Sequence, residues 1–451
     1  MNIRVFFTRG LLLICLVLCT FIQPRESQAQ SPRAVNVWTQ QAKLYAGWSS
    51  DYFGSAAALS ADGNTLAIGA PEFDKPGDPN PDQGAVYVYV RSGTTWSQQE
   101  RLTVADTYGG DRFGSAVALS SDGNTLLAGA RTQDIGPDVQ RGSAYVFARS
   151  GTTWTQQQKL HAPDGTDYDE FGGAVAISSD GNTAIIGALG DDTGSIQNHG
   201  AAYVFTRSGT SWSIQQKLTS VQLVSEHFGG AVAISNDGNT IAVGVLGRDV
   251  YTNSRPGSAY VFTRSGTTWT QQQQLTAADG ANDDNFGSAV ALHTGTNMLV
   301  IGAPGLTNGG TWQGAFYVFQ ESGGLWTQQQ KVTAADVVAG NRFGSTAAIN
   351  TNGNTILVGA MYHDIGGNAD QGAVYVFTRS NGVWMQQQKL IAADGAFQDE
   401  FGSAVALNAN GSTLAVGARY ASVTRREQGA TYVFFNPPVY PFSLYLPLVL
   451  R

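Results

Sequence analysis

Acidic residues recur at two fixed places beside a Phe-Gly pair that appears seven times in the chain. Two positions before each Phe, the copies carry in order Asp51, Asp111, Asp169, Glu226, Asp284, Asn341 and Asp399. Four positions after the apolar residue that ends the preceding segment, five copies carry Asp106, Asp164, Asp279, Asp336 and Asp394, and the other two carry Trp48 and Gln222. Carboxylates at regular spacing can act as metal ligands, as acid–base pairs or as acceptors that hold a turn.

Calcium is the metal that these acids suit best, because a hard cation prefers several carboxylate oxygens. The densest clusters are Asp164, Asp167 and Asp169 in one loop and Asp279, Asp283 and Asp284 in another. The competing interpretation, which we favour, is that acids beside turns accept hydrogen bonds from loop amides. We therefore expect no cofactor, and calcium at these two clusters stays the alternative.

The remaining reactive residues form no catalytic pattern. The histidines lie at different positions of the repeat and form no symmetric cluster: His161, His199, His227, His293 and His363. The sequence has no Gly-x-Ser-x-Gly elbow, no His-Glu-x-x-His pair, no phosphate-binding loop and no dinucleotide fingerprint. We therefore expect that the protein is not an enzyme. A pair of acids facing each other across a central channel, as in a glycosidase, stays open.

The elements that must position these residues form an internal repeat. The Phe-Gly pairs begin at Phe53, Phe113, Phe171, Phe228, Phe286, Phe343 and Phe401, at intervals of 57 to 60 residues. Each copy holds four strand-like segments, which in the second copy lie at 115–120, 125–130, 142–147 and 154–160. Short turns join the first segment to the second and the third to the fourth. The pattern predicts an all-β fold, a seven-bladed β-propeller with four antiparallel strands per blade.

One segment of the repeat comes too early in the chain. The fourth segment starts at Trp38, Trp96, Trp154, Trp212, Trp269, Trp326 and Trp384, so one copy precedes the first Phe-Gly pair and none follows the last. We therefore predict that residues 37–44 pair with residues 430–434 and complete the last blade, which would leave no open sheet end. We also expect each Phe of the pair to wedge between blades and each Gly to permit close backbone approach.

These segments resemble the FG-GAP repeats of the integrin α-subunit propeller, and more closely those of bacterial secreted proteins with the same repeat. The matching segments of the first copy are Phe53-Gly54, Ile68-Gly69-Ala70-Pro71 and Val86-Tyr87-Val88-Tyr89. The resemblance covers about residues 36–435 and implies the propeller fold. It does not bring the calcium motif of the integrin repeats, because the turn between the first two strands, Ser60-Ala61-Asp62-Gly63-Asn64, lacks the alternating acids before Asp62.

The connections between the second and third strands vary most from copy to copy. Variable loops on a rigid scaffold are where binding residues gather, and aromatic residues beside Arg are typical of binding hot spots. The off-pattern candidates for ligand binding are Asp74, Asp78, Arg248, Tyr251, Arg255, Trp312, Tyr420, Arg425 and Arg426. For each of them, a solvated loop side chain is the alternative.

Residues 1–29 have the pattern of an export signal, with Arg4, Arg9, an apolar run of 12 residues at 11–22 and a small residue at Ala29. The run is shorter than the roughly 20 residues of a membrane span. We expect cleavage near Ala29 and a mature, secreted or cell-surface-associated chain without a transmembrane segment. Residues 30–435 would form the propeller, and residues 436–451 a Pro-rich apolar tail of open role. The two cysteines, Cys15 and Cys19, precede Ala29, so no disulfide is expected.

Charge narrows the expected partners. The net charge is −8, and the sequence has no run of Lys and Arg, so nucleic acid is not an expected partner. We expect an extracellular protein or glycan as ligand. The favoured function is a non-enzymatic binding or adhesion-type scaffold that uses the face of the variable loops. The alternatives are a carbohydrate-binding or carbohydrate-active propeller, either lectin or hydrolase, and a structural surface component.

Overall fold

A computed structural model of the protein describes residues 37–47, 50–74, 77, 81–194, 196–221, 226–246, 256–293, 295, 297–308 and 311–436. Contacts within the chain separate residues 1–36 from a compact unit of residues 37–451, and every element described below belongs to that unit. The expected export signal and all of the expected tail except Asn436 lie outside the described residues. The described part of the chain consists of strands and turns, and none of it forms a helix that could span a membrane.

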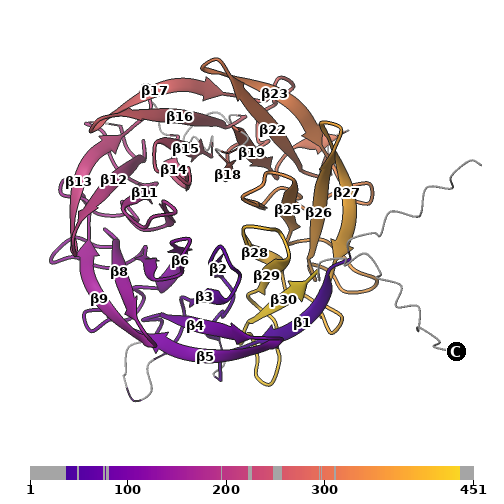
Figure 1. The fold of residues 1–451 in the computed structure, drawn as a ribbon, viewed down its shortest axis with the longest axis horizontal. Coiled ribbons are helices and arrows are strands. Elements are labelled where there is room, and N and C mark those ends of the chain that lie inside the picture. Colours follow the sequence, from indigo (N-terminus) through magenta and orange to yellow (C-terminus); the bar gives the residue numbers. More distant parts are fainter. Residues whose placement is uncertain are drawn as a thin grey trace, which may run out of the picture. The chain divides into compact units, whose positions relative to one another are not determined.

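Seven four-stranded antiparallel sheets form the ring in Figure 1, and we call them blades 1 to 7. Blade 1 contains β2 (Ala56–Leu59), β3 (Thr65–Ala70), β4 (Ala85–Ser92) and β5 (Thr95–Leu102). Blade 2 contains β6 (Phe113–Leu119), β7 (Thr125–Ala130), β8 (Ser143–Ser150) and β9 (Thr153–Leu160). Blade 3 contains β10 (Ala174–Ile177), β11 (Thr183–Ala188), β12 (Ala201–Ser208) and β13 (Ser211–Leu218). The predicted fold is confirmed.

The other four blades repeat this order. Blade 4 contains β14 (Phe228–Ile234), β15 (Thr240–Val245), β16 (Ser258–Ser265) and β17 (Thr268–Leu275). Blade 5 contains β18 (Ala289–His293), β19 (Met298–Ala303), β22 (Ala315–Ser322) and β23 (Leu325–Val332), and carries a small hairpin of β20 (Thr307–Asn308) and β21 (Thr311–Trp312). Blade 6 contains β24 (Thr346–Ile349), β25 (Thr355–Ala360), β26 (Ala373–Ser380) and β27 (Val383–Leu390). Blade 7 contains β28 (Phe401–Leu407), β29 (Thr413–Ala418), β30 (Ala430–Phe435) and β1 (Thr39–Leu44).

The residue types of each strand follow its distance from the ring axis. The innermost strands are built from Ala, Val and Ser, since seven of them must converge, and they line a channel of about 270 Å³. The second strands are fully buried between neighbouring blades, as in β7, and accordingly read as continuous apolar runs. The outermost strands are only partly buried, as in β9, where Trp154 and Leu160 alone are buried, because only one of their faces meets the core.

The ring closes where the sequence predicted. Strand β1 pairs antiparallel with β30, from Thr39 opposite Phe435 to Leu44 opposite Thr431, and Figure 1 shows the first and last strands side by side. The indole of Trp38 is 3% exposed and donates to the Gly411 carbonyl at 3.0 Å. The predicted pairing of residues 37–44 with the last blade is therefore confirmed.

Each Phe-Gly pair joins two blades. Phe113 is fully buried, packs at 5.5 Å between ring centroids against Tyr145 of its own blade, and belongs to one cluster with Val86 and Val88 of blade 1. Gly114 has a φ of +91°, and a Cβ there would lie 2.4 Å from the Ala85 carbonyl oxygen. Both expectations for the pair, a wedge and a close approach, are confirmed.

A belt of glutamines links the outer strands, which the sequence analysis did not foresee. The Gln158 amide donates to the Trp212 carbonyl at 2.9 Å and accepts from the Trp212 amide at 2.8 Å. The same reciprocal pair links blades 4, 5, 6 and 7 to their predecessors. The link that includes Gln388 and Trp38 anchors the closing strand by side chain as well as by its backbone.

Candidate functional site

The ring has two faces with different connections. We call the side that carries the connections between first and second and between third and fourth strands the turn face, and the opposite side the loop face. On the turn face of blade 2, Asp122 accepts from the Ser120 hydroxyl at 2.6 Å and the Asn124 amide at 3.0 Å. Arg149 donates to the Asn124 side chain at 2.9 Å and to Thr65 of blade 1 at 3.1 Å. These polar groups therefore stabilise the turns and the contact between neighbouring blades.

The acids two positions before each Phe hold loops on the opposite side. Asp169 is 1% exposed and accepts from the Thr166 amide at 2.7 Å. The same contact, with the amide three positions earlier, is made by Asp111, Asp284, Asn341 and Asp399. Burial raises the pKa of Asp169 to about 6, with a further contribution from the negative charge of Asp191 and an opposing one from the Thr166 bond. The interpretation as loop-holding acceptors is confirmed for these positions.

The second set of acids forms ion pairs with lysines. Asp164 accepts from the Tyr203 hydroxyl at 2.8 Å and from the Lys217 ammonium at 2.8 Å. Burial acts to raise its pKa, but the bonds from Lys217 and Tyr203 outweigh burial and hold the pKa of Asp164 below its usual value. The same Tyr–Asp–Lys contact occurs at Asp106, Asp279, Asp336 and Asp394.

The sequence did contain a signal for these ion pairs. The lysine lies five positions after the Trp of the fourth strand, and in two copies Arg101 and Gln274 replace it. These are the two copies whose loops carry Trp48 and Gln222 in place of the acid. Acid and lysine are therefore kept or lost together, as a contacting pair would be.

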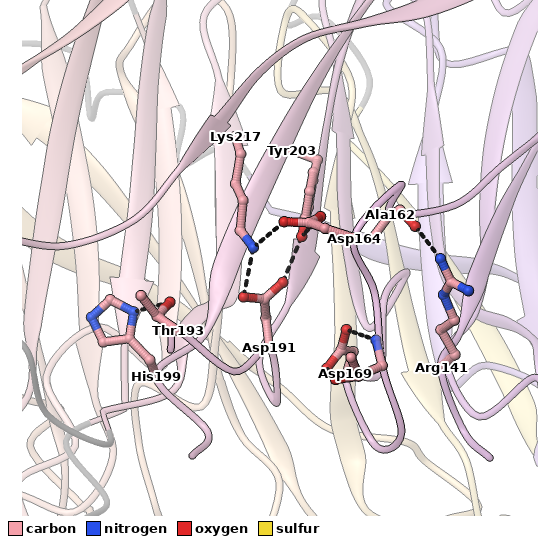
Figure 2. A network of polar contacts seen from close by, with 10 residues as sticks. Arg141, Ala162, Asp164, Asp169, Asp191, Thr193, His199, Tyr203 and Lys217 are labelled. Atoms are coloured by element: carbon pink, nitrogen blue, oxygen red, sulfur yellow. Dashed lines mark hydrogen bonds and ion pairs between the residues drawn. The ribbon is translucent and has the colours of Figure 1, made fainter. Parts of the chain in front are cut away.

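In blade 3 the lysine contacts a second carboxylate, as Figure 2 shows. Lys217 lies between two carboxylates, at 2.8 Å from Asp164 and 2.9 Å from Asp191, and the Tyr203 hydroxyl donates to Asp191 at 2.5 Å. Burial raises the pKa of Asp191, against the bonds from Lys217 and Tyr203. One ammonium is thus shared by two carboxylates, and the neutral phenol adds a hydrogen bond to each of them, so the cluster links the loops of the blade to its outer strands.

The structure does not gather the two predicted calcium clusters around a common point. Among the described residues, no three side chains of His, Cys, Asp or Glu converge as metal ligands would. Asp164 and Asp279 bind lysines, Asp169 and Asp284 hold backbone amides, and Asp167 accepts from the Val139 amide at 2.8 Å. Calcium is not part of the function proposed below.

A row of non-glycine residues with left-handed backbone surrounds the channel on the loop face. The residue before each Phe-Gly pair has a φ between 51° and 57°, and the seven are Tyr52, Arg112, Glu170, His227, Asn285, Arg342 and Glu400. For an L-residue this conformation costs about 1–2 kcal/mol. No copy uses glycine at this position, although glycine would avoid the cost. Such persistent strain is typical of functional positions.

Two hollows lie on the loop face. The first, about 310 Å³, is near the axis between blades 4, 5 and 6 and is lined by Leu246, Asp283, Asn285, Ser288, Pro304, Gly305, Arg342, Ser345 and Met361. The second, which we call the seam pocket, has about 530 Å³ and is lined by Tyr52, Phe397, Gln398, Glu400, Tyr420, Ser422, Arg426 and Glu427. It lies where blade 7 meets blade 1.

The seam pocket combines aromatic faces with paired charges. The rings of Tyr52 and Tyr420 meet edge to face, with centroids 4.8 Å apart. Phe397 is 61% exposed. Glu400 binds Arg419 at 2.7 Å, and Arg426 binds Glu427 at 3.1 Å. Burial raises the pKa of Tyr52 to about 12, helped by Glu72, so its hydroxyl stays protonated at neutral pH.

The predicted ligand-binding residues have different outcomes. Tyr420 and Arg426 line the seam pocket, and Arg425 is exposed on the same loop. Asp74 accepts from the Asp82 amide at 2.7 Å and so holds its own loop. Asp78, Arg248, Tyr251 and Arg255 lie outside the described residues, and of Trp312 only the backbone is described, paired with Thr307.

Most residues of the seam pocket were not predicted from the sequence. They include Tyr52, Phe397, Gln398, Glu400 and Glu427. One signal was present in the sequence: the residue before each Phe-Gly pair varies between copies and is never glycine, and Tyr52 and Glu400 are two of these residues. The pattern of a single copy does not show that the loop near residue 52 lies against the loop near residue 420.

Comparisons with known proteins agree with this architecture. A profile of the FG-GAP repeat matches seven segments, residues 38–89, 96–147, 154–205, 212–262, 269–319, 326–377 and 384–434. The chain is 29% identical to integrin alpha-2 of Mus musculus over 180 residues, which is 37% of this chain and 14% of the integrin. It is 27% identical to integrin alpha-M of Mus musculus over 165 residues, 35% of this chain and 14% of that integrin. The match thus spans about one seventh of either integrin.

Proposed function

The chain belongs to the FG-GAP repeat family, and from this premise we propose that it is an extracellular, non-enzymatic binding module of the adhesion type that holds its ligand on the loop face. The observation that carries the proposal is the contrast between the faces. On the turn face, the acids accept hydrogen bonds from their own turn, and the arginines donate to an Asn of that turn and to a Thr of the preceding blade. On the loop face, the variable residues surround two hollows.

Further observations support the parts of this proposal. The similarity to two integrin α subunits supports an adhesion-type role. The basic residues, apolar run and small residue at Ala29 support export. The ring supports binding without a large conformational change, because the glutamine belt links blades 2 to 7 in series and the closing strand completes blade 7.

Carbohydrate binding is the second candidate function, and the seam pocket favours it. Three aromatic side chains, Tyr52, Phe397 and Tyr420, line a hollow that also offers amide, hydroxyl and charged groups. Its volume is that of a small-molecule site, and five of its eight lining residues are polar or charged, which suits a ligand with many hydroxyl groups.

Site-directed blocking tests the assignment of the face. The protein of residues 30–451 has no cysteine, because Cys15 and Cys19 precede it, so a single introduced thiol can carry one bulky polyethylene glycol chain. We would label Ser422→Cys or Val139→Cys on the loop face and Thr152→Cys on the turn face. Capture of a ligand from cell-envelope material should be lost with either or both loop-face labels and retained with the turn-face label.

The opposite pattern would contradict the proposal. If the Thr152→Cys label blocks capture and both loop-face labels leave it intact, the ligand binds the turn face. Release of reducing sugar from envelope glycans by the purified protein would contradict the non-enzymatic part.

A further inference from the structure

The seam pocket lies at the ring closure, where loops from distant parts of the chain meet. Tyr52 comes from the loop that enters blade 1, Phe397 from the loop between blades 6 and 7, and Tyr420 from blade 7 itself. The pocket therefore exists only when β1 has closed the ring. Its volume of about 530 Å³ lies within the range of small-molecule sites.

Half of the residues that line the pocket have strained backbone. The φ values of Tyr52, Gln398, Glu400 and Glu427 are 51°, 61°, 54° and 50°. Each costs about 1–2 kcal/mol relative to a right-handed conformation, and glycine at the same place would not. The same left-handed backbone recurs at equivalent positions of other blades, as at Tyr168 for Gln398 and Asn198 for Glu427, so the backbone belongs to the repeat and only the side chains are particular to the pocket.

The charges in the pocket are balanced by partners beside them. Glu400 accepts from Arg419 at 2.8 Å and 2.7 Å, and Glu427 accepts from Arg426 at 3.1 Å. Burial raises the pKa of Glu400, opposed by Arg419. A charged ligand would meet a cation and an anion at similar range, so the pocket favours a neutral ligand that can use both kinds of group.

We propose that the seam pocket is a carbohydrate subsite that holds one neutral hexopyranose ring. The proposal rests on the proposed binding function of the loop face and names the ligand class of one site within it. A sugar ring has an apolar C–H face, which suits the exposed ring of Phe397. The Arg419 guanidinium lies over the Tyr420 ring, 4.9 Å from its centroid, so Tyr420 would contact the sugar with the part of the ring that Arg419 leaves uncovered. Its hydroxyls donate and accept, which suits Gln398, Ser422 and the two ion pairs.

A quaternary ammonium ligand is the class that the geometry disfavours. Aromatic cages bind such cations through ring faces, and Tyr52, Phe397 and Tyr420 could supply the rings. Arg426 and Arg419, however, already pair with Glu427 and Glu400, so both carboxylates of the pocket are neutralised before a cation could bind them. The choice between a neutral sugar and a cation is therefore open to direct measurement.

Saturation-transfer NMR on the protein of residues 30–451 tests the proposal. The probes are the methyl pyranosides of glucose, galactose and mannose, with tetramethylammonium as the cation. We expect at least one glycoside to bind and tetramethylammonium not to bind. Phe397→Ala and Tyr420→Ala should each weaken the bound glycoside about tenfold or more, and Tyr420→Phe, which keeps the ring, should retain most of the affinity.

Blade 3 supplies the matched control. Tyr168 is 57% exposed with a φ of 64°, and its place in the loop corresponds to that of Gln398. Tyr168→Ala should leave glycoside affinity unchanged, and all variants should melt like the parent because these rings are exposed or half-buried. Binding of no glycoside, unchanged affinity in both alanine variants, or a preference for tetramethylammonium would overturn the proposal.

The two proposals fail in different ways. If no glycoside binds but loop-face labels still block ligand capture, the carbohydrate subsite is wrong and the binding face stands. If the labels at Ser422→Cys and Val139→Cys do not block capture, the binding face itself is wrong, whatever the glycosides do.

Discussion

The two faces of the ring meet the same geometric demand with different residues. On both faces the chain needs left-handed backbone to make its connections. The turn face supplies it with glycine, as at Gly63, Gly123 and Gly151, and among the described residues uses a non-glycine only at Asn297 and Asn381. The loop face uses glycine as well, as at Gly54 and Gly84, but carries the other sixteen non-glycine residues of this kind that the structure describes. Strained non-glycine backbone is therefore concentrated on the loop face.

The contacts of the side chains explain the difference. On the turn face, a residue that changed would break a bond to the preceding blade, such as Arg149 to Thr65. On the loop face, the recurring acids lie under the loops and bind backbone amides or lysines, so the exposed residues above them are not needed for the ring. A strained, varied residue can persist where its cost is offset by binding.

Removing the closing strand should have the largest effect, because both faces depend on it. Deletion of residues 30–45 takes away β1 and Trp38, and leaves β30 paired only with β29, as an open edge strand of blade 7. We expect loss of cooperative thermal unfolding, followed by circular dichroism, and loss of all ligand binding. Gln40→Ala, an exposed change in the same strand, is the control and should melt like the parent. A deletion protein with the parental melting curve would refute the need for ring closure.

A pair of glycine substitutions separates strain from crowding. Gly114→Ala puts a methyl group 2.4 Å from the Ala85 carbonyl oxygen at a φ of +91°, whereas Gly151 on the turn face has a φ of +63° and no heavy atom within 4 Å of a Cβ. Gly151→Ala should cost about 1 kcal/mol for the left-handed backbone alone. Gly114→Ala should cost about 3 kcal/mol or more, because overpacking adds to it. Thermal or denaturant unfolding measures both, and equal losses would contradict the close contact between blades.

The architecture could be predicted because seven copies report it independently. The period of the repeat, its four strands and the early position of Trp38 predicted the ring and its closure. The burial of Phe113 and the close contact at Gly114 confirm the roles expected for the Phe-Gly pair. The proposed binding face also follows from the sequence, since loops vary where the scaffold does not constrain them. Tyr420 and Arg426 were found because they depart from the repeat.

The rest of the site depends on which loops meet. Tyr52 and Phe397 gain significance only beside Tyr420, and no local pattern brings residues 52 and 420 together before the ring is closed. The lysine partners were missed for another reason. Considered alone, Asp164 and Asp279 suggest a cation site, and only comparison with the fourth strand shows that Lys217 and Lys331 already supply the cation.

Buried acids of the loop face and turn acids of the turn face should contribute to the pH dependence of stability with opposite signs. The pKa of Asp169 is raised by burial to about 6, against about 3.9 for an unfolded Asp. The folded protein therefore binds more protons than the unfolded chain between about pH 4 and 6. The contribution of Asp169 thus favours folding as the pH falls from 7 towards 4, and this gain is lost as the pH rises through 6.

Asparagine variants isolate that contribution. Asp169→Asn should raise stability at pH 7 by about 1–2 kcal/mol and flatten the profile between pH 5 and 7, because an amide can keep the Thr166 bond as Asn341 keeps that of Val338. Asp180 on the turn face has its pKa lowered by bonds from Ser178 and Asn182 that outweigh burial, so Asp180→Asn should lower stability slightly at pH 7. The measurement is the melting temperature of both variants at pH 5 and pH 7. If both substitutions change the stability at pH 7 in the same direction, the predicted difference between the two faces is wrong.

Relief of strain should give the smallest effect and the sharpest test of the comparison. Gln398 in the seam pocket and Asn381 on the turn face have φ values of 61° and 52°. Glycine at either place removes about 1–2 kcal/mol of left-handed strain but adds roughly 0.5–1 kcal/mol of backbone entropy, so each variant should gain up to about 1 kcal/mol. Binding should separate them, because Gln398→Gly removes an amide from the pocket and Asn381→Gly removes nothing near it. We expect weaker glycoside binding for the first and parental binding for the second, measured on proteins of equal or higher melting temperature. If both variants bind as the parent does, the strain at Gln398 has a structural cause, and the loop face differs from the turn face in sequence variation alone.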